Sequence, residues 1–297
     1  MVLDSCSGGL WERNILVLVI PGNPELDLVV REPPLALRGL IDGYLGYRMS
    51  GFAPALHRGL PSSHMTFIVS IGSPIVVVEQ TSPVQRPDRY RCVLSGLQAS
   101  SAVISHDGRQ EGVAIELTPL GCRALFGMPA RELWDLSFEF GDVVGRRGEE
   151  LWDRLQYAPT WSDRFHVCDD VLTRMMTARH VAPELAACWR GIVGSAGQVR
   201  VAALAEHTGY SRQHLTRLFR SEFGLGPKLA SRVVRFDAAQ RELRSQPGTP
   251  LADIAQHAGF ADQAHFTREC LELAGCTPRE PRAESVPKVQ ESVTANE

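Results

Sequence analysis

The sequence predicts an α+β protein, with a β-rich N-terminal domain under covering helices and an all-α C-terminal domain. Three observations support this class. Short runs of β-branched and aromatic residues, separated by turn residues, fill residues 40–117. Helical patterns replace them after residue 119. A helical pattern then occurs twice between residues 201 and 282, which indicates a duplicated supersecondary unit. A chain of 297 residues is long enough for two domains.

The expected strands begin early in the chain. The apolar run at residues 15–20 predicts a buried strand. Residues 65–71 and 75–79 are rich in β-branched residues and are bounded by Gly-Ser-Pro, and residues 89–94 continue the pattern. Several short strands at this spacing predict a small sandwich or barrel.

One local signal predicts a hairpin. Residues 102–105 and 113–117 flank the segment His-Asp-Gly-Arg at residues 106–109. Asp-Gly favours the positive φ angles of a tight turn between paired strands.

Helical segments follow the strands. Their apolar residues recur at helical spacing, and they either cover the β domain or form a dimer face. They are expected at residues 120–126, 129–134, 149–157, 162–179 and 183–193. Glycines at 191, 194 and 197 predict a flexible joint, and the polar tail lacks hydrophobic periodicity and is expected to be disordered. The expected parts are therefore residues 1–190, 191–282 and 283–297.

Cysteine use and hydropathy indicate a soluble cytoplasmic protein without a membrane partner. The seven cysteines are scattered and include no Cys-x-x-Cys pair, as expected for reduced thiols. The six apolar residues at 15–20 are far fewer than the ~20 needed to cross a bilayer. No basic segment precedes this run, so it does not resemble a signal peptide.

Catalytic and metal-binding motifs are missing from the sequence. Ser70 and Ser95 lack the Gly-x-Ser-x-Gly setting of a nucleophile elbow. No His-Glu-x-x-His motif or phosphate-binding glycine loop occurs. His57 and His64 are more simply explained as surface or core histidines than as a metal pair. We therefore expect no catalytic residues, no bound metal and no cofactor.

The C-terminal pattern is a repeat. Residues 202–210 read AALAEHTGY, and residues 252–260, fifty positions later, read ADIAQHAGF. Beyond the glycine the alignment of the two copies shifts by one residue, and after this shift the copies match again. The matching residues are His214, Thr216, Arg217, Gly224 and Pro227 in the first copy and His265, Thr267, Arg268, Gly275 and Pro278 in the second.

Each copy predicts two helices joined by a sharp turn. A glycine suits the left-handed conformation that ends the first helix, and an aromatic residue then fills the angle between the helices. The second helices are expected over residues 211–223 and 262–274, where Ser and Asp are good N-caps. Together these features predict a helix-turn-helix unit. The turn residues are Gly209 and Tyr210 in the first copy and Gly259 and Phe260 in the second.

The second helix of such a unit lies in the DNA major groove, and its exposed residues contact base edges. Arginine recognises guanine and glutamine recognises adenine. The expected base contacts are Arg212, Gln213, Thr216 and Arg217 in the first copy and Gln263, His265, Thr267 and Arg268 in the second. Residues placed by their charge to contact phosphates are Arg220, Lys228, Arg232 and Arg244.

The two copies are joined by a predicted helix at residues 228–245, about 27 Å long at ~1.5 Å per residue. It would hold the two reading helices about one DNA turn apart, ~34 Å, in successive major grooves. Glycine-broken helix pairs also occur in many all-α proteins, but repetition of the same polar residues favours DNA binding. Residues 198–282 carry 12 Lys/Arg against 9 Asp/Glu, whereas residues 1–197 carry 18 against 22. This excess suggests that only the C-terminal part contacts a polyanion.

These residues in this order resemble the arabinose-operon-regulator (AraC/XylS) family of bacterial transcription factors. The resemblance covers about 85 C-terminal residues. It implies two helix-turn-helix subdomains joined by a long helix. It also implies a DNA-binding regulator with RNA polymerase as a partner if it activates. In this family an N-terminal β domain, often cupin-like, binds a small-molecule effector or forms a homodimer.

The second copy departs from the family pattern. Cys270 stands where phenylalanine is usual, Leu271 where a basic residue is common, and Pro281 where an aromatic residue precedes Arg282. Loss of a large core side chain costs a few kcal/mol unless neighbours fill the space. We expect Leu271 and Leu273 to repack this core, or the second unit to be less rigid.

Two alternatives to an effector-controlled regulator stay open at this point. One is an effector-independent or weakly specific DNA-binding protein, with a low ratio of specific to non-specific affinity. The other is an N-terminal enzyme tethered to a DNA-binding module.

Overall fold

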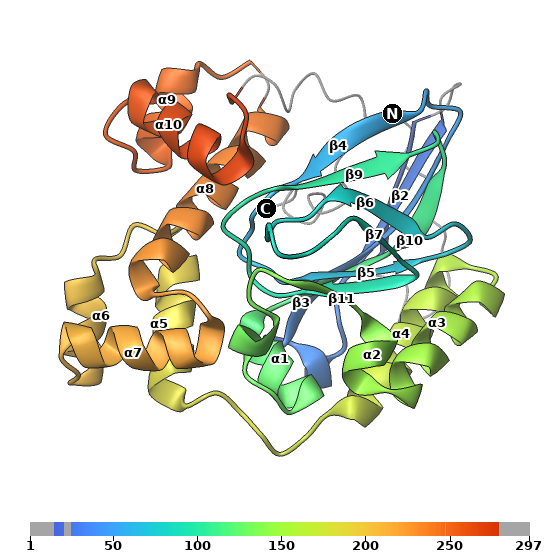
Figure 1. Cartoon of the computed structure of the whole chain (residues 1–297), viewed down its shortest axis with the longest axis horizontal. Helices are drawn as coiled ribbons and strands as arrows, with labels where there is room; N and C mark the ends of the chain where they lie inside the picture. Colours follow the sequence, from blue (N-terminus) through green and yellow to red (C-terminus); the bar gives the residue numbers. More distant parts are fainter. Residues whose placement is uncertain (1–14, 21–24, 247, 279–297) are drawn as a thin grey trace.

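Two antiparallel β-sheets form the N-terminal part of the protein, and helices form most of the rest (Figure 1). The computed structural model describes residues 15–20, 25–246 and 248–278. Within these ranges one sheet has seven strands, in the order β1-β2-β3-β10-β5-β8-β11, and the other has four, in the order β4-β9-β6-β7. The predicted α+β class is confirmed, with the β-rich part first and the paired helical units last.

The strand bounds follow the apolar runs of the sequence. The larger sheet consists of β1 (Ile15–Ile20), β2 (Glu25–Arg31), β3 (Ile41–Ser50), β10 (Gln110–Leu117), β5 (Thr66–Ser70), β8 (Cys92–Ser95) and β11 (Ser137–Glu139). The smaller sheet consists of β4 (Ala55–Gly59), β9 (Ala102–His106), β6 (Ile75–Glu79) and β7 (Asp88–Tyr90).

β10 shows how the larger sheet separates two interiors. Successive side chains of a strand point to opposite faces. Val113 and Leu117 are buried in a core shared with the helices. Ala114 and Glu116, on the other face, line a cavity that side chains of the smaller sheet also line. Both faces of the larger sheet are therefore covered.

The structure corrects two strand predictions. Residues 89–94 do not form one strand, because β7 ends at Tyr90 and β8, which begins at Cys92, lies in the other sheet. The hairpin prediction is also wrong, because β9 pairs with β4 and β6 whereas β10 pairs with β3 and β5. Gly108 does have a positive φ of 94°. Its turn carries the chain between sheets, so that Ile104 and Ala114 line the same cavity.

The helices after β10 cover the larger sheet. They are α1 (Pro119–Phe126), the 3₁₀ helix η2 (Ala130–Leu133), α2 (Phe140–Val144), α3 (Arg146–Tyr157) and α4 (Trp161–Met175). A second 3₁₀ helix, η1 (Leu35–Leu37), lies earlier in the chain, between β2 and β3, and contacts α4. Residues 129–134 were expected to begin a helix, and only a 3₁₀ turn forms there. The Phe165 ring on α4 stacks on Tyr44 of β3 with 5.9 Å between ring centroids. The sequence left open whether these helices cover the β domain or form a dimer face, and their contacts show that they cover it.

The remaining helices form the C-terminal part. They are α5 (Pro183–Gly194), α6 (Val201–Thr208), α7 (Arg212–Phe223), α8 (Pro227–Ser245), α9 (Leu251–His257) and α10 (Gln263–Ala274). Figure 1 shows α5 beside α6, α7 and α8, and a long connection leading to it from α4. A boundary at residue 190 would divide α5, so we propose a boundary at residues 176–182.

The expected joint at residues 191–197 is part of this packed region. Gly191 and Gly194 lie inside α5. Gly197 has a φ of 74°, and a Cβ there would collide with the carbonyl oxygen of Ser231 on α8. The Arg235 guanidinium donates a hydrogen bond to the Gly197 carbonyl oxygen at 2.9 Å. Gly197 therefore serves a close-packed turn, and Gly191 and Gly194 continue a helix, so this segment is not a loose linker.

Two hydrophobic cores divide the C-terminal part unequally. Phe219 and Phe223 of α7 belong to the same core as the N-terminal sheet and its helices. Phe236 of α8 and Phe266 of α10 belong to a second core. Leu60 of the N-terminal domain is buried in that second core, and Ala99 of the same domain packs against it.

Candidate functional site

The first helical unit, α6 and α7, has a capped turn. Gly209 has a φ of 71° and ends α6. Ser211 is the N-cap of α7, and its hydroxyl accepts a hydrogen bond from the His214 backbone N–H at 3.2 Å. The Tyr210 ring lies edge-on to the His214 ring, with 4.9 Å between centroids. The direction of α7 is therefore determined by the sequence Gly-Tyr-Ser at its start.

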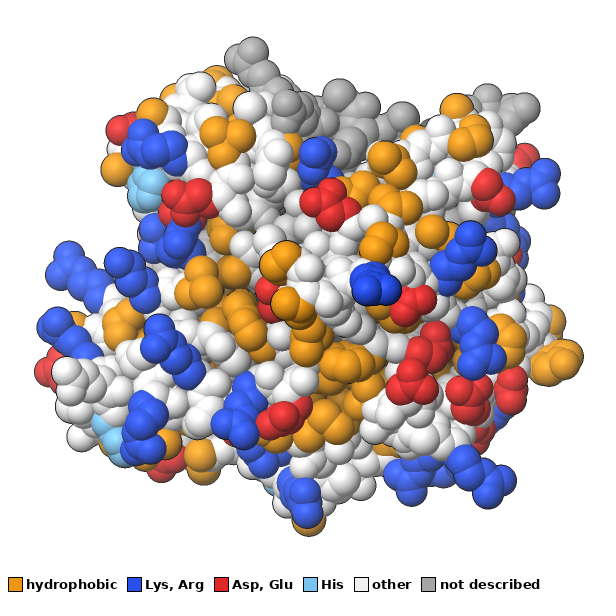
Figure 2. Space-filling model, in the orientation of Figure 1, with side chains coloured by type: hydrophobic (Ala, Val, Ile, Leu, Met, Phe, Trp, Pro, Cys, Tyr) orange, Lys and Arg blue, Asp and Glu red, His pale blue; other side chains and the backbone are white. Residues whose placement is uncertain are grey.

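The outward face of α7 is polar and basic. Thr216 donates a hydrogen bond to the Arg212 carbonyl oxygen at 2.7 Å. The Arg217 guanidinium lies 3.1 Å from the His214 ring nitrogen Nδ1. Figure 2 shows basic side chains over the corner of the molecule formed by α6 and α7. The residues that border one shallow concavity here are Arg212, Gln213, Thr216, Arg217 and Arg220.

The second unit, α9 and α10, repeats this geometry. Gly259 has a φ of 78°. Asp262 is the N-cap of α10, and its carboxylate accepts a hydrogen bond from the His265 backbone N–H at 2.7 Å. The Phe260 ring lies edge-on to the His265 ring at 5.4 Å. Thr267 donates to the Gln263 carbonyl oxygen at 2.9 Å, as Thr216 does in α7.

The exposed face of α10 carries less positive charge than that of α7. Gln263 and Arg268 are exposed. His265 is half-buried, and its Nε2 lies 3.7 Å from a Glu269 carboxylate oxygen. Leu271 is 50% exposed and occupies the position on α10 that Arg220 occupies on α7. The two units thus share a backbone plan but differ in charge.

Two of the four expected phosphate contacts lie elsewhere. Arg220 and Lys228 are exposed. Arg232 instead pairs with Glu269 at 3.0 Å and with Glu272, both on α10. Arg244 lines the interior cavity, where burial lowers its pKa to about 10. Arg232 is thus held in ion pairs and Arg244 lies at the cavity wall, which leaves Arg220 and Lys228 as the exposed members of the expected set.

The core of the second unit is filled despite Cys270. Cys270 is 1% exposed and accepts a hydrogen bond from the Gln240 side-chain amide at 3.6 Å. Leu273 is buried in this core, whereas Leu271 points to solvent. The expectation that Leu271 repacks the core is wrong, because its position on α10 faces outward. Pro281 lies outside the described residues, as does the tail from residue 283.

A cavity of about 250 Å³ lies between the two sheets and α8. This volume is close to the lower end of the range for small-molecule pockets, about 300–1,000 Å³. Phe67, Val77 and Ile104 are among its apolar lining residues. At the end next to α8 the lining is polar. The polar side chains there include Asp42, His64, Glu116, Asp237, Gln240, Arg241 and Arg244.

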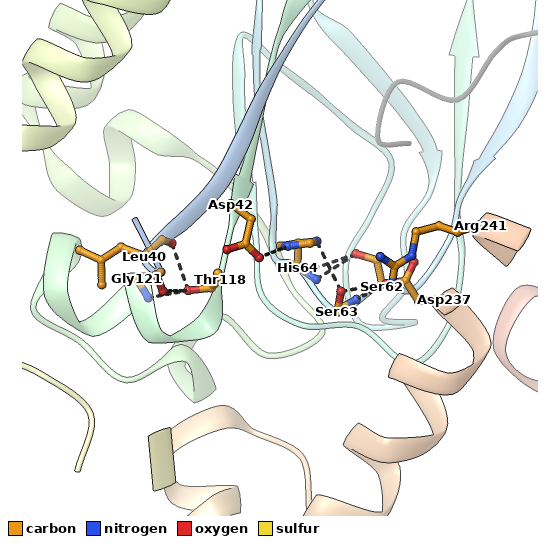
Figure 3. Close-up of polar contacts among 10 residues, drawn as sticks. Leu40, Asp42, Ser62, Ser63, His64, Thr118, Gly121, Asp237 and Arg241 are labelled. Carbon is orange, nitrogen blue, oxygen red and sulfur yellow. Dashed lines mark hydrogen bonds and ion pairs between the residues drawn. The ribbon is translucent and has the colours of Figure 1, made fainter. Parts of the chain in front are cut away.

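Hydrogen bonds join the polar end of the cavity to α8 (Figure 3). The Ser63 backbone N–H and hydroxyl donate to one carboxylate oxygen of Asp237 at 3.0 and 2.8 Å. Arg241 donates to the same oxygen at 3.3 Å. His64 Nε2 lies 2.8 Å from an Asp42 carboxylate oxygen. We call Asp42, Ser63, His64, Asp237 and Arg241 the interdomain latch.

The two histidines considered as a metal pair have separate surroundings. His64 belongs to the latch, whereas the His57 ring lies 5.7 Å from the His106 ring. Within the described ranges, no group of three or more His, Cys, Asp or Glu residues is placed to hold a metal ion. In the same ranges no helix is both long enough and apolar enough to cross a membrane.

Family models match two parts of the chain. Residues 204–284 match a helix-turn-helix domain, and residues 30–139 match a domain of unknown function (DUF6597). The arabinose operon regulatory protein of Escherichia coli (strain K12) is 31% identical over 91 residues, which cover 31% of this chain and 31% of that protein. In its C-terminal region the chain is similar to the AraC/XylS family of transcription regulators.

A second curated relative matches a stretch of similar length. The HTH-type transcriptional regulator GlxA of Rhizobium meliloti (strain 1021) is 37% identical over 76 residues, or 26% of this chain and 23% of that protein. This chain therefore matches about a third or less of the length of these curated relatives. The solved structure of ToxT from Vibrio cholerae O395 aligns at 15% identity with a TM-score of 0.47, covering 80% of this chain and 95% of that one.

The latch and the cavity could not be predicted from the sequence. One signal was nevertheless available. Asp237 and Gln240 are buried polar residues of α8, next to its apolar stripe. Buried polar groups need partners, and both residues find them, in Ser63 for Asp237 and in Cys270 for Gln240.

Proposed function

We propose that this protein is a sequence-specific DNA-binding transcription regulator that inserts α7 and α10 into successive major grooves. The observation that carries the proposal is the repeated capped helix with the same polar residues on its exposed face. Ser211 and Asp262 cap the two helices at equivalent positions, each by accepting a hydrogen bond from the backbone N–H three residues later. Thr216 and Thr267 make the same backbone hydrogen bond in each.

The proposed base contacts are those expected from the sequence. On α7 they are Arg212, Gln213, Thr216 and Arg217, and on α10 they are Gln263, His265, Thr267 and Arg268. Arg220 and Lys228 are the proposed phosphate contacts. The 19 residues of α8 give a rod of about 28 Å at ~1.5 Å per residue. That length is compatible with reading helices about one DNA turn apart, ~34 Å.

We also propose that a small-molecule effector occupies the cavity and changes the placement of the second unit. The first unit is tied to the N-terminal domain by the shared core and by an ion pair between Arg123 on α1 and Glu222 on α7. The second unit is held through α8, through Leu60, and through a hydrogen bond from Ser101 to the Ala274 carbonyl oxygen at 2.9 Å. Because the cavity borders α8 and the latch, an occupant acts first on this second set of contacts.

Homodimer formation through the N-terminal domain, and contact with RNA polymerase if the protein activates transcription, belong to the same proposal. Sedimentation of the full chain with and without operator DNA measures the first. Transcription from a selected operator in vitro measures the second.

Binding-site selection on random DNA, followed by gel-shift assays, tests the main proposal. Arg217→Ala should reduce the ratio of specific to non-specific affinity about five- to hundredfold, since a good bidentate contact contributes about 1–3 kcal/mol of discrimination. Arg89→Ala is the matched control, because Arg89 is an exposed arginine of β7 in the N-terminal domain. If selection yields no preferred sequence, or if both variants retain the full ratio, the proposed reading by α7 is wrong.

A further inference from the structure

Glu116 lies in the wall of the cavity, beside an irregularity in the sheet. The register between β10 and β3 shifts between Ile115 and Leu117. On this stretch Glu116 faces the cavity, as Gln110 and Ala114 do. The neighbouring β3 residue on the cavity lining is Asp42 of the latch.

The other charged groups at this end of the cavity have partners. Asp42 pairs with His64, and Asp237 pairs with Arg241 and Ser63. The two other arginines of the lining, Arg58 and Arg244, also have partners. Among the residues that the structure describes, none donates a hydrogen bond to Glu116 or forms an ion pair with it.

The electrostatic surroundings of Glu116 favour a positive charge. Burial raises the pKa of its carboxyl, and the carboxylates of Asp42 and Asp237 raise it further, against the opposing effects of His64 and Arg241. Three carboxylates, of Asp42, Glu116 and Asp237, share this end of the cavity with Arg241, Arg244 and His64. The cations already have partners, whereas no described residue pairs with Glu116. A buried carboxylate without a partner is costly, and an ammonium group or another cation would stabilise it.

We propose that the cavity binds a small, mainly apolar amine whose ammonium group pairs with the Glu116 carboxylate. The inference rests on the effector part of the proposed function and names the chemical class of the effector. The apolar part of the amine lies against the inner faces of the two sheets, beside Phe67, Val77 and Ile104. An anion of the same size is disfavoured, because the cations at the polar end already have partners and the Glu116 carboxylate would repel it.

The site also places the ligand next to α8. Asp237 lines the same end of the cavity and holds Ser63 across the domain boundary. An ammonium group at Glu116 lies in the field of the Asp237 carboxylate and competes with Arg241 for it. Occupancy of the cavity thereby acts on the contact that joins the N-terminal domain to the helix between the two reading units.

The experiment measures binding of three matched probes, hexylamine, hexan-1-ol and hexanoate, to the full-length protein by calorimetry at pH 7.5. We expect hexylamine to bind at least tenfold more tightly than the alcohol or the carboxylate. Glu116→Gln should weaken hexylamine binding at least tenfold and leave the alcohol unaffected. Glu79→Gln is the matched control, because Glu79 is an exposed carboxylate that does not line the cavity.

Three outcomes overturn the inference: hexylamine does not bind, the alcohol or the carboxylate binds as well as the amine, or a folded Glu116→Gln protein binds the amine unchanged. The comparison of the three probes uses the unaltered protein, so it tests the preference for an amine even if the Glu116→Gln variant does not fold. Gel shifts on the same preparation separate this test from the proposed function. Specific DNA binding without amine binding refutes only the ligand class, whereas loss of specific DNA recognition refutes the proposed function itself.

Discussion

The Glu222 carboxylate of α7 accepts two hydrogen bonds from the Arg123 guanidinium of α1, at 2.9 and 2.6 Å. Glu222 is 7% exposed and lies on the proposed reading helix, whereas Arg123 belongs to the N-terminal domain. This bidentate ion pair therefore attaches the first unit to the β-rich domain by a directional contact.

Removing one partner of this pair should destabilise the protein. Arg123→Ala leaves a buried carboxylate without its cation, and we expect a loss of about 2 kcal/mol in the free energy of unfolding. That is less than the ~3–5 kcal/mol of a fully buried pair, because Arg123 keeps some contact with solvent. Urea unfolding of the variant and of the unaltered protein measures this loss of stability. The double variant Arg123→Ala, Glu222→Gln should recover part of the loss, and an equal or larger loss would contradict this account.

Two glycines with the same backbone conformation should respond differently to alanine. Gly209 and Gly224 have φ angles of 71° and 87°. A Cβ at Gly209 meets no neighbouring atom within 4 Å, whereas one at Gly224 collides with the Trp134 side chain of the N-terminal domain. We expect Gly209→Ala to cost about 1–2 kcal/mol, the penalty of the left-handed conformation, and Gly224→Ala to cost clearly more. Thermal unfolding of both variants measures the two losses of stability, and equal losses would exclude the domain contact at Gly224.

The exposed Leu271 offers a gain-of-affinity test of the second unit. Leu271→Arg restores on α10 the charge that Arg220 provides on α7. We expect tighter binding to all DNA sequences and an increase of about one in the slope of log affinity against log salt. Leu35→Arg is the matched control, since Leu35 is an exposed leucine of the N-terminal domain. An unchanged salt slope for Leu271→Arg would place this face of α10 away from the phosphates.

The latch makes stability depend on pH. Burial lowers the pKa of His64, but the hydrogen bond with Asp42 and the charges of Glu116 and Asp237 outweigh it, so the pKa is raised above 6.5. The folded state then binds a proton that the unfolded state releases. The contribution of His64 is fully present below about pH 6.5 and is lost as pH rises through the raised pKa. Asp42→Asn should flatten the decline of the melting temperature between about pH 6 and pH 8, whereas His180→Asn, at an exposed position, should not. A profile unaffected by Asp42→Asn would exclude this pair as the cause.

The parts of the fold that the sequence predicts are those encoded locally. Gly209 with Ser211, and Gly259 with Asp262, specify a helix end and a helix start within a few residues, and the structure has both. The pairing of β9 and β10 is not local. An Asp-Gly turn specifies a change of direction, but whether the next strand pairs or crosses to another sheet depends on where its apolar face is buried.

The same limit applies to the site. The sequence assigns Arg217 and Arg244 the same kind of exposed cation, and only the packing of α8 against the sheets separates them. Arg217 lies on a free helix face, whereas Arg244 lines the cavity. The position of Glu116 in the cavity could not be predicted either. Alternation along β10 shows that Glu116 faces away from Val113, but it does not show that a second sheet lies opposite.

Leu60 has a consequence for engineering this chain. Its side chain comes from the N-terminal domain but fills the core around Phe236 and Phe266. A chimera that replaces the N-terminal domain with one from a relative exchanges this side chain too, and leaves a hole or a clash in a unit that was not itself altered. A domain swap therefore needs to keep Leu60 together with the C-terminal helices whose core it fills. Among relatives, the residue at position 60 should vary together with the residue at position 236.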